Sequence, residues 1–242
     1  MYRSLGNGEG SHRTNRSGIE KPGPSRLPSI EIMTTTNATT SITSVTLEVA
    51  DVDAARRFYK AFGVDSCIRL RESAENTSGF RGFTLALTVS GPATVDAFLD
   101  AAVDAGAEVT KPAAKSLWGY GGAVQAPDGT IWKVATSAKK DTGPATRNID
   151  EFVLLLGVDD VKATKKFYVE RGLVAGRSFG GKYAEFTSEA SSPVTLALYK
   201  RRALAKDLGI PVDGTGSHRI VIGCTAEGFV DPDGYVWEAV VG

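Results

Sequence analysis

One segment of the sequence occurs twice, and this repeat constrains the fold more than any other feature. The first copy, VTLEVADVDAARRFY, spans residues 45–59, and the second, LLLGVDDVKATKKFY, spans residues 154–168. A second pair follows in the same order, with APDGTIWKVAT at 126–136 and DPDGYVWEAVV at 231–241. Two matches in one order at nearly one offset indicate a tandem duplication.

The duplication predicts two domains of roughly 95 residues each in a chain of 242 residues. We assign 42–137 to the first domain, 138–147 to a polar linker and 148–242 to the second domain. Residues 1–41 are rich in Gly, Ser, Thr, Asn, Pro and Arg. They bury too little apolar surface to offset the entropy of ordering, so we expect a disordered tail. The sequence leaves open whether the protein starts at Met1 or at Met33.

Composition narrows the range of functions. Hydrophobic residues make up 42% of the chain and the formal net charge is zero, which is typical of a globular protein and offers no basic face to nucleic acid. No apolar run reaches the ~18 residues that span a bilayer, so we expect no membrane partner. Cys67 and Cys224 lack C-x-x-C spacing and are expected to be free thiols, which places the protein in the cytoplasm.

Hydrophobic periodicity predicts the secondary structure. Residues 42–49 alternate, which predicts a strand with one packed face and one polar face that carries Ser44, Thr46 and Glu48. Residues 149–158 are almost continuously apolar, which predicts a strand buried on both faces. Helices are expected at 51–63, 92–106, 160–171 and 201–209. Further strands are expected at 66–71, 80–89, 108–109, 121–125, 130–135, 174–179, 183–187, 194–199, 218–224 and 235–240.

A strand, a D-x-x-x-A-x-x-F-Y helix, several strands and a closing D-P-D-G strand together resemble the vicinal oxygen chelate superfamily, which includes glyoxalases, bleomycin-resistance proteins and extradiol dioxygenases. The resemblance covers nearly everything after residue 41. It implies an α+β fold of two tandem glyoxalase-like domains, in which βαβββ modules form curved, cup-like mixed sheets. The first domain is short of strands in its first module, and the second lacks a helix and two strands before its final strand. We therefore expect the two domains, or two chains of a homodimer, to complement each other.

The resemblance also implies where a divalent metal would be held: on the first strand, at the start of the second module, and on the last strand. In the first domain these positions fall on Ser44, about Thr84, and Lys133. Hydroxyls and an ammonium are poor ligands for such a cation, so no metal is expected there. We expect Ser44 and Lys133 to lie near each other on one sheet, with Lys133 either contacting an anionic ligand or remaining a solvated edge charge.

In the second domain the resemblance points to His218 and Glu238, with Glu151 two residues before Val153 on the first strand. These three residues are the candidate ligands for one divalent metal, which would be Zn, Ni, Mn or Fe. Glu238 is also the candidate catalytic residue. The alternative is that His218 bonds to nearby backbone or to Glu238.

A ligand cavity is expected between paired modules. The alternation of the first strand suggests that Ser44, Thr46 and Glu48 line this cavity, and the glycine-rich loop adds Trp118 and Tyr120. Lys133 is the sixth residue expected to bind the ligand. Three functions stay open. The first is a glyoxalase-like protein that binds a small organic ligand without a complete metal site. The second is a metal-dependent lyase, isomerase or dioxygenase, and the third is a structural or regulatory protein whose cup is filled by its own side chains.

Overall fold

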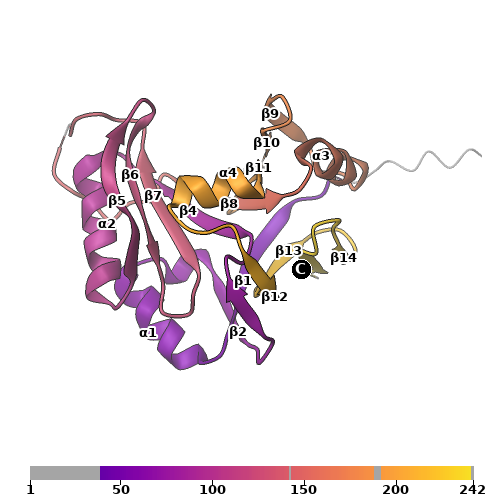
Figure 1. The fold of residues 1–242 in the computed structure, drawn as a ribbon, viewed down its shortest axis with the longest axis horizontal. Coiled ribbons are helices and arrows are strands. Elements are labelled where there is room, and N and C mark those ends of the chain that lie inside the picture. Colours follow the sequence, from indigo (N-terminus) through magenta and orange to yellow (C-terminus); the bar gives the residue numbers. More distant parts are fainter. Residues whose placement is uncertain (1–38, 142, 188–191, 241–242) are drawn as a thin grey trace, which may run out of the picture. The chain divides into compact units, whose positions relative to one another are not determined.

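The computed structural model describes residues 39–141, 143–187 and 192–240 (Figure 1). The predicted tail, up to residue 38, lies outside the described residues. The helices are α1 (Val52–Phe62), α2 (Pro92–Asp104), α3 (Val161–Glu170) and α4 (Arg201–Leu208), with a 3-10 turn at Asp65–Cys67. In the described part of the chain, no helix combines the length and the apolar character that crossing a membrane requires.

The strands follow the predicted order, with three short additions (β3, β12 and β14). They are β1 (Ile42–Val49), β2 (Arg69–Glu72), β3 (Thr77–Gly79), β4 (Phe83–Thr88), β5 (Glu108–Ser116), β6 (Gly119–Gln125), β7 (Ile131–Thr136), β8 (Glu151–Val158), β9 (Ala175–Phe179), β10 (Tyr183–Phe186), β11 (Thr195–Lys200), β12 (Gly214–Gly216), β13 (Ile220–Cys224), β14 (Phe229–Val230) and β15 (Val236–Ala239).

The start of the repeat folds as its sequence predicts. Val45 and Leu47 of β1 are fully buried, while the alternate side chains Thr46 and Glu48 are partly exposed. Helix α1 follows, and the Asp51 side chain caps it by accepting a hydrogen bond from the Ala54 N–H at 2.8 Å. The α+β character of the chain therefore follows directly from these local signals.

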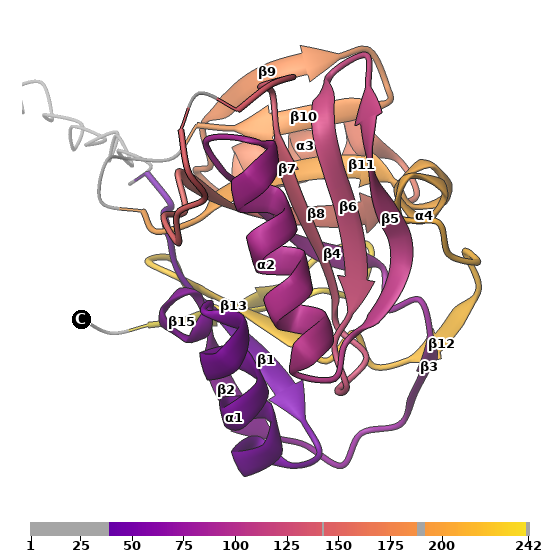
Figure 2. The ribbon, with the colours of Figure 1, turned by 90° about the vertical axis from the view of Figure 1, so that its left-hand side faces the viewer.

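Two complete βαβββ modules form an eight-stranded sheet. Its strand order is β5-β6-β7-β4-β8-β11-β10-β9, so β4 to β7 with α2 make one module and β8 to β11 with α3 make the other. The two first strands, β4 and β8, pair antiparallel in the middle, with Leu85 opposite Leu154. Strand β8 is buried on both faces between β4 and β11, as predicted. Figure 2 shows α2 lying across one face of this sheet.

A second sheet has five strands in the order β14-β15-β13-β1-β2. It joins two abbreviated modules: β1, α1 and β2 from the start of the chain, and β13, β14 and β15 from its end. The helix predicted to be missing before the final strand is absent between β13 and β15, where the chain forms only the two-residue β14. Strands β1 and β13 pair antiparallel, with Val45 opposite Ile222.

Both sheets combine strands from the two halves of the sequence repeat. The predicted linker at 138–147 falls between β7 and β8, inside the module pair that forms the eight-stranded sheet. The two halves therefore complement each other within one chain, but the division at 138–147 does not separate two sheets. The described residues share one compact unit of contacts.

The two repeated motifs touch each other in each half. The Tyr59 hydroxyl on α1 donates to Asp128 Oδ2 at 2.6 Å, in the turn before β7. In the second copy the Tyr168 hydroxyl on α3 donates to Asp231, in the turn before β15. Each tyrosine also packs on the tryptophan of that last strand, at Trp132 and Trp237. The spacing of the motifs thus reflects contacts that join α1 to the eight-stranded sheet and α3 to the five-stranded sheet.

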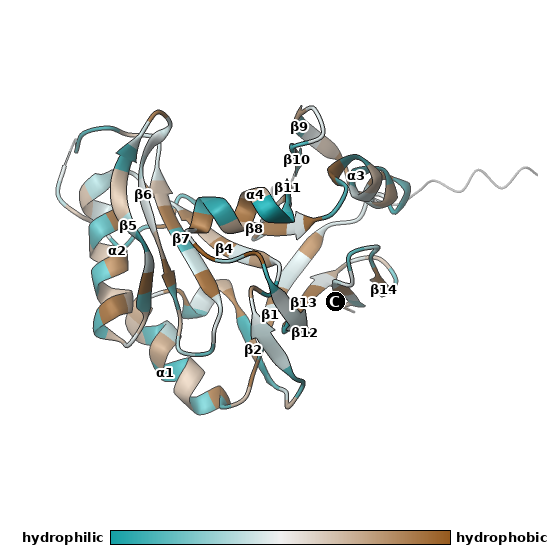
Figure 3. Cartoon of the chain, viewed as in Figure 1, coloured by the Kyte–Doolittle hydropathy of each residue, from teal (hydrophilic) through white to brown (hydrophobic). Residues whose placement is uncertain are grey.

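Helix α4 covers the concave face of the eight-stranded sheet. Its apolar residues Leu204, Ala205 and Leu208 are buried against a cluster that includes Ala86 of β4 and Leu155 of β8. Figure 3 shows hydrophobic residues along the strands and both hydrophilic and hydrophobic residues on the helices. The inner wall of the only complete module pair in the described chain is therefore occupied by a segment of the same chain.

Candidate functional site

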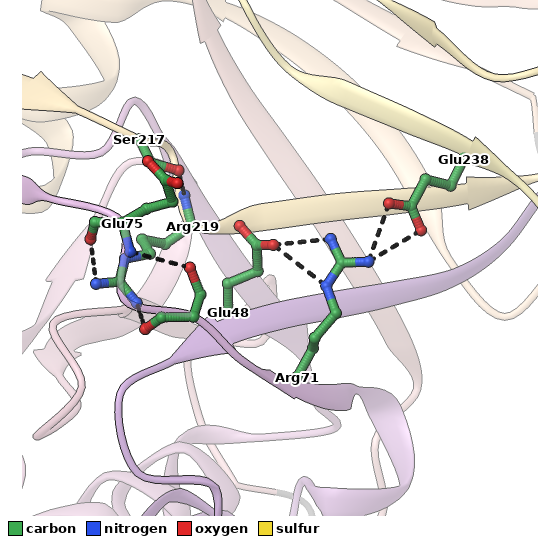
Figure 4. A network of polar contacts seen from close by, with 7 residues as sticks. Glu48, Arg71, Glu75, Ser217, Arg219 and Glu238 are labelled. Carbon is green, nitrogen blue, oxygen red and sulfur yellow. Dashed lines mark hydrogen bonds and ion pairs between the residues drawn. The ribbon is translucent and has the colours of Figure 1, made fainter.

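The polar face of the five-stranded sheet carries a row of charges (Figure 4). Arg71 on β2 reaches across β1 and β13, and its Nη2 donates to Glu48 Oε1 at 2.7 Å while its Nη1 donates to Glu238 Oε1 at 2.9 Å. Thr46 lies on the same face of β1. We call Ser44, Thr46, Glu48, Arg71 and Glu238 the polar strip. It unites three predicted ligand-binding residues with the predicted catalytic Glu238.

A second arginine lies beside the polar strip. Arg219 is almost completely buried, with Nη1 donating to the Ser73 carbonyl at 2.5 Å and Nη2 to the Glu75 carbonyl. Its φ is +56°, the one positive value found at a non-glycine residue in the described chain. A large side chain in this region is strained, so the surrounding contacts hold it there.

Next to this arginine, a groove of about 560 Å³ runs beside α1. We call it the α1 groove. Ala54, Phe58 and Ala61 of α1 line it, and Ala105 and Pro127 add further apolar surface. Its polar lining comprises Glu48, Asp51, Arg57, Tyr59, Arg81, Asp128 and Arg219. Small-molecule sites are commonly this size and combine apolar walls with a few polar groups.

Arg81 is a half-buried cation of the α1 groove. Its Nη2 donates to the Asp128 carbonyl, in the turn that Tyr59 also contacts. Burial lowers the pKa of Arg81, the nearby Asp128 raises it, and the positive charge of Arg219 lowers it again. Three arginines thus line the groove, Arg57, Arg81 and Arg219, and Arg81 among them contacts the polar turn.

The predicted Lys133 lies in the eight-stranded sheet and is engaged by α4. Its Nζ donates to Asp207 Oδ2 at 2.5 Å, and Lys111 Nζ reaches Asp207 Oδ1 at 3.2 Å. Burial alone would raise the pKa of Asp207, but the two lysines lower it below its ordinary value. Lys133 therefore binds a carboxylate of its own chain. Ser44 is in the five-stranded sheet, so the prediction that Ser44 and Lys133 lie near each other on one sheet is wrong.

Trp118 and Tyr120 are also separated from the polar strip. Trp118 is 83% exposed at the turn between β5 and β6, and the Tyr120 hydroxyl donates to Asp96 on α2 at 2.8 Å. Together with Lys133 they line a small pocket of about 240 Å³ beside Asp207. The single predicted cavity is thus corrected to two places, because strand parity predicts which side chains share a face but not which strands become neighbours.

The structure does not bring the three predicted metal ligands together. Glu151 is on β8 and accepts a hydrogen bond from Thr195 Oγ1 at 2.8 Å, whereas Glu238 is on β15 and pairs with Arg71. His218 contacts the Arg81 carbonyl through Nδ1 and the Asp233 carbonyl through Nε2 at 3.0 Å. Both ring nitrogens of His218 are engaged with backbone, as the alternative reading expects.

Sequence reasoning missed Arg71, Arg81, Arg219 and Asp207. The alternation in RLRE at 69–72 was a usable signal for Arg71, since pairing with β1 places it beside Glu48. Arg81 and Arg219 lie outside the strands, in segments with no periodicity, so no local pattern identifies them. The sequence predicts that Asp207 lies in a helix, but it does not predict the contacts with Lys111 and Lys133, because these lysines lie on strands distant in the sequence.

No protein-family model matches the sequence, and no curated protein matches it significantly. Solved structures do. Glyoxalase I from Zea mays superposes with a TM-score of 0.53 at 15% identity, over 82% of this chain and 91% of that chain. A mutant of that enzyme gives a TM-score of 0.51 at 16% identity, over 82% and 92%. The chain has a glyoxalase-like fold. At these identities the likeness concerns the fold.

Within this glyoxalase-like fold, the residues present do not fit a divalent metal. On the concave face of the eight-stranded sheet, the candidate positions are Thr84, Lys133 and Val153, and α4 packs over that face. On the polar strip, the guanidinium of Arg71 lies between the two carboxylates. The described residues contain no group of three or more His, Cys, Asp or Glu side chains placed to hold a metal ion.

Proposed function

We propose that this protein binds a small organic ligand in the α1 groove, without a complete metal site. The observation that carries this proposal is the groove itself, whose volume of about 560 Å³ combines an apolar wall on α1 with polar groups that include Glu48. Sites of this kind derive affinity from apolar burial and orientation from a few polar contacts. The polar strip lies directly beside it, because Glu48 belongs to both.

The occupied concave face supports the same choice of site. In the eight-stranded sheet, Leu204, Ala205 and Leu208 of α4 fill the apolar inner wall, and Lys133 is paired with Asp207. A ligand in that position would have to displace a helix of the chain. The α1 groove needs no such displacement, so it is the more accessible site.

Blocking the α1 groove tests the proposal. The full-length protein is titrated with a library of small organic fragments of mixed charge, and binding is followed by amide shifts in ¹H–¹⁵N NMR spectra. We expect fragments that shift the amides of α1 in the unmodified protein to lose binding in Ala54→Trp, because the indole fills the groove from an exposed helix position.

The matched control is Lys60→Trp. Lys60 is exposed on the same helix but does not line the groove, so this variant should bind the same fragments as the unmodified chain. The proposal is contradicted if no fragment shifts the α1 amides, or if Ala54→Trp and Lys60→Trp bind the fragments equally well.

A further inference from the structure

Two arginines of the α1 groove, the buried Arg219 and the half-buried Arg81, form no ion pair with a carboxylate within the described chain. The acceptors of Arg219 are the Ser73 and Glu75 carbonyls, and its Nε has no partner among the described residues. Arg81 donates through Nη2 to a carbonyl, and its Nη1 also lacks a described partner. Neither residue takes part in any ion pair of the described chain. Backbone carbonyls satisfy hydrogen bonds but leave each unit charge in place.

The acidic residues of the groove are already engaged elsewhere. Glu48 pairs with Arg71 at 2.7 Å. Asp128 accepts hydrogen bonds from the Tyr59 hydroxyl at 2.6 Å and from the Thr130 N–H at 2.8 Å, and Asp51 caps α1. None of these contacts is an ion pair with Arg81 or Arg219, although the Asp128 charge lies near enough to raise the pKa of Arg81.

The position of Arg219 is held at a conformational cost. A non-glycine residue with φ of +56° costs about 1 kcal/mol or more, and such residues often occur at binding sites. Its fork is fixed by two carbonyls, so the side chain is already ordered before any ligand arrives. A pre-ordered arginine loses less entropy when it binds an anion.

From this arrangement we infer that the α1 groove binds an organic oxyanion, a carboxylate or phosphate monoester with an apolar body. The oxyanion pairs with the positive charges of Arg81 and Arg219, since a hydrogen bond between a guanidinium and a carboxylate or phosphate is strengthened by both charges. The apolar body packs on Ala54, Phe58 and Pro127. This inference rests on the proposed function, because it names the ligand class of the same groove.

Matched probes test the charge requirement. The full chain is titrated with hexanoate, with its neutral isostere hexanamide and with hexyl phosphate, and affinities are measured by calorimetry. We expect hexanoate and hexyl phosphate to bind about ten-fold or more tightly than hexanamide, which is the scale of a charge-assisted hydrogen bond. The preferred anion then distinguishes a carboxylate ligand from a phosphate ester.

Arginine variants locate the charge. Arg81→Gln should reduce the preference for hexanoate over hexanamide to about one-fold, while Arg219→Lys should weaken it and Arg56→Gln, an exposed control on α1, should leave it unchanged. Circular dichroism confirms that each variant is folded, and the comparison of hexanoate with hexanamide on the unmodified chain needs no variant.

The outcomes separate this inference from the proposed function. Equal binding of hexanoate and hexanamide, a preference that survives in Arg81→Gln, or failure of both anions to bind would overturn the anion assignment. In each of these cases, fragment binding that Ala54→Trp abolishes would still support the groove as the ligand site. Anion binding that Ala54→Trp leaves intact would overturn the anion assignment for this groove.

Discussion

The repeated tyrosines show how single residues connect the two sheets. Tyr59 and Tyr168 are completely buried, and each hydroxyl donates to an aspartate in the turn before a final strand, at Asp128 and Asp231. Burial raises the pKa of both phenols well above the ordinary value, so they remain donors under all physiological conditions. A buried donor paired with a carboxylate contributes more than a neutral hydrogen bond.

Removing one of these hydroxyls should therefore be costly. We expect Tyr168→Phe to lower the free energy of unfolding by about 1.5–3 kcal/mol, because the buried Asp231 loses a donor. Urea denaturation measures the change. The control is Tyr199→Phe, at a half-buried tyrosine whose ring packs on Tyr183, with an expected change of about 0.5 kcal/mol or less. Equal losses in the two variants would contradict a specific role for the Tyr168 hydroxyl.

At this scale the sequence predicts faces but not partners. The alternation at 42–49 predicted that Ser44, Thr46 and Glu48 share one face, and they do. It could not predict that Arg71 would bridge Glu48 to Glu238, because that contact depends on β13 lying between β1 and β15. The pairing of strands distant in sequence is a property of the whole sheet and leaves no local signal.

Among the elements, α4 departs furthest from what the resemblance implied. The sequence predicted this helix correctly, but only the structure shows that it covers the concave face where the resemblance placed a metal or ligand. Gly157 of β8 allows the close approach, since a Cβ there would lie 3.0 Å from the Arg201 Cα. A structural or regulatory protein was expected to have a cup filled by its own side chains. In the eight-stranded sheet, side chains of α4 fill the cup in this way.

The ion pairs of Asp207 should make the docking of α4 sensitive to acid. The pKa of this carboxyl is lowered in the folded chain, so its contribution is complete above the ordinary value of about 3.9 and is lost as the pH falls through the lower folded value. Since the Asp207 side chain is 39% exposed, water screens its ion pairs, and we expect Asp207→Asn to cost about 1 kcal/mol or less near neutral pH.

Urea denaturation of both proteins at a series of pH values measures this effect. The stability difference between the unmodified chain and Asp207→Asn should shrink as the solution becomes more acidic than the ordinary pKa of an aspartate. Asp104→Asn, at an exposed residue that ends α2, serves as the control. A difference that is independent of pH would contradict the role assigned to Lys111 and Lys133.

For the molecule as a whole, the duplication in the sequence and the division into sheets do not coincide. The repeat correctly indicates modules and their order, since the motifs of each copy pack together. The sheets instead pair the inner modules with each other and the outer modules with each other. Similarity between copies records how the chain is built, whereas strand pairing depends on which module edges can meet. This is why the sequence predicts complementary halves but not the neighbours in each sheet.

Separating the halves should consequently prevent either from folding. Separating the chain at the loop 138–147 into two fragments would remove the antiparallel pairs β4 with β8 and β1 with β13, leaving four apolar strands with unpaired edges. We expect the fragments 1–141 and 142–242, expressed separately, to show no cooperative unfolding by circular dichroism, and an equimolar mixture to recover it. As a control, the intact chain cleaved at a protease site inserted in this loop should elute as one species in size-exclusion chromatography. Cooperative unfolding of either fragment alone would show that the halves are independent domains, in disagreement with the observed strand order.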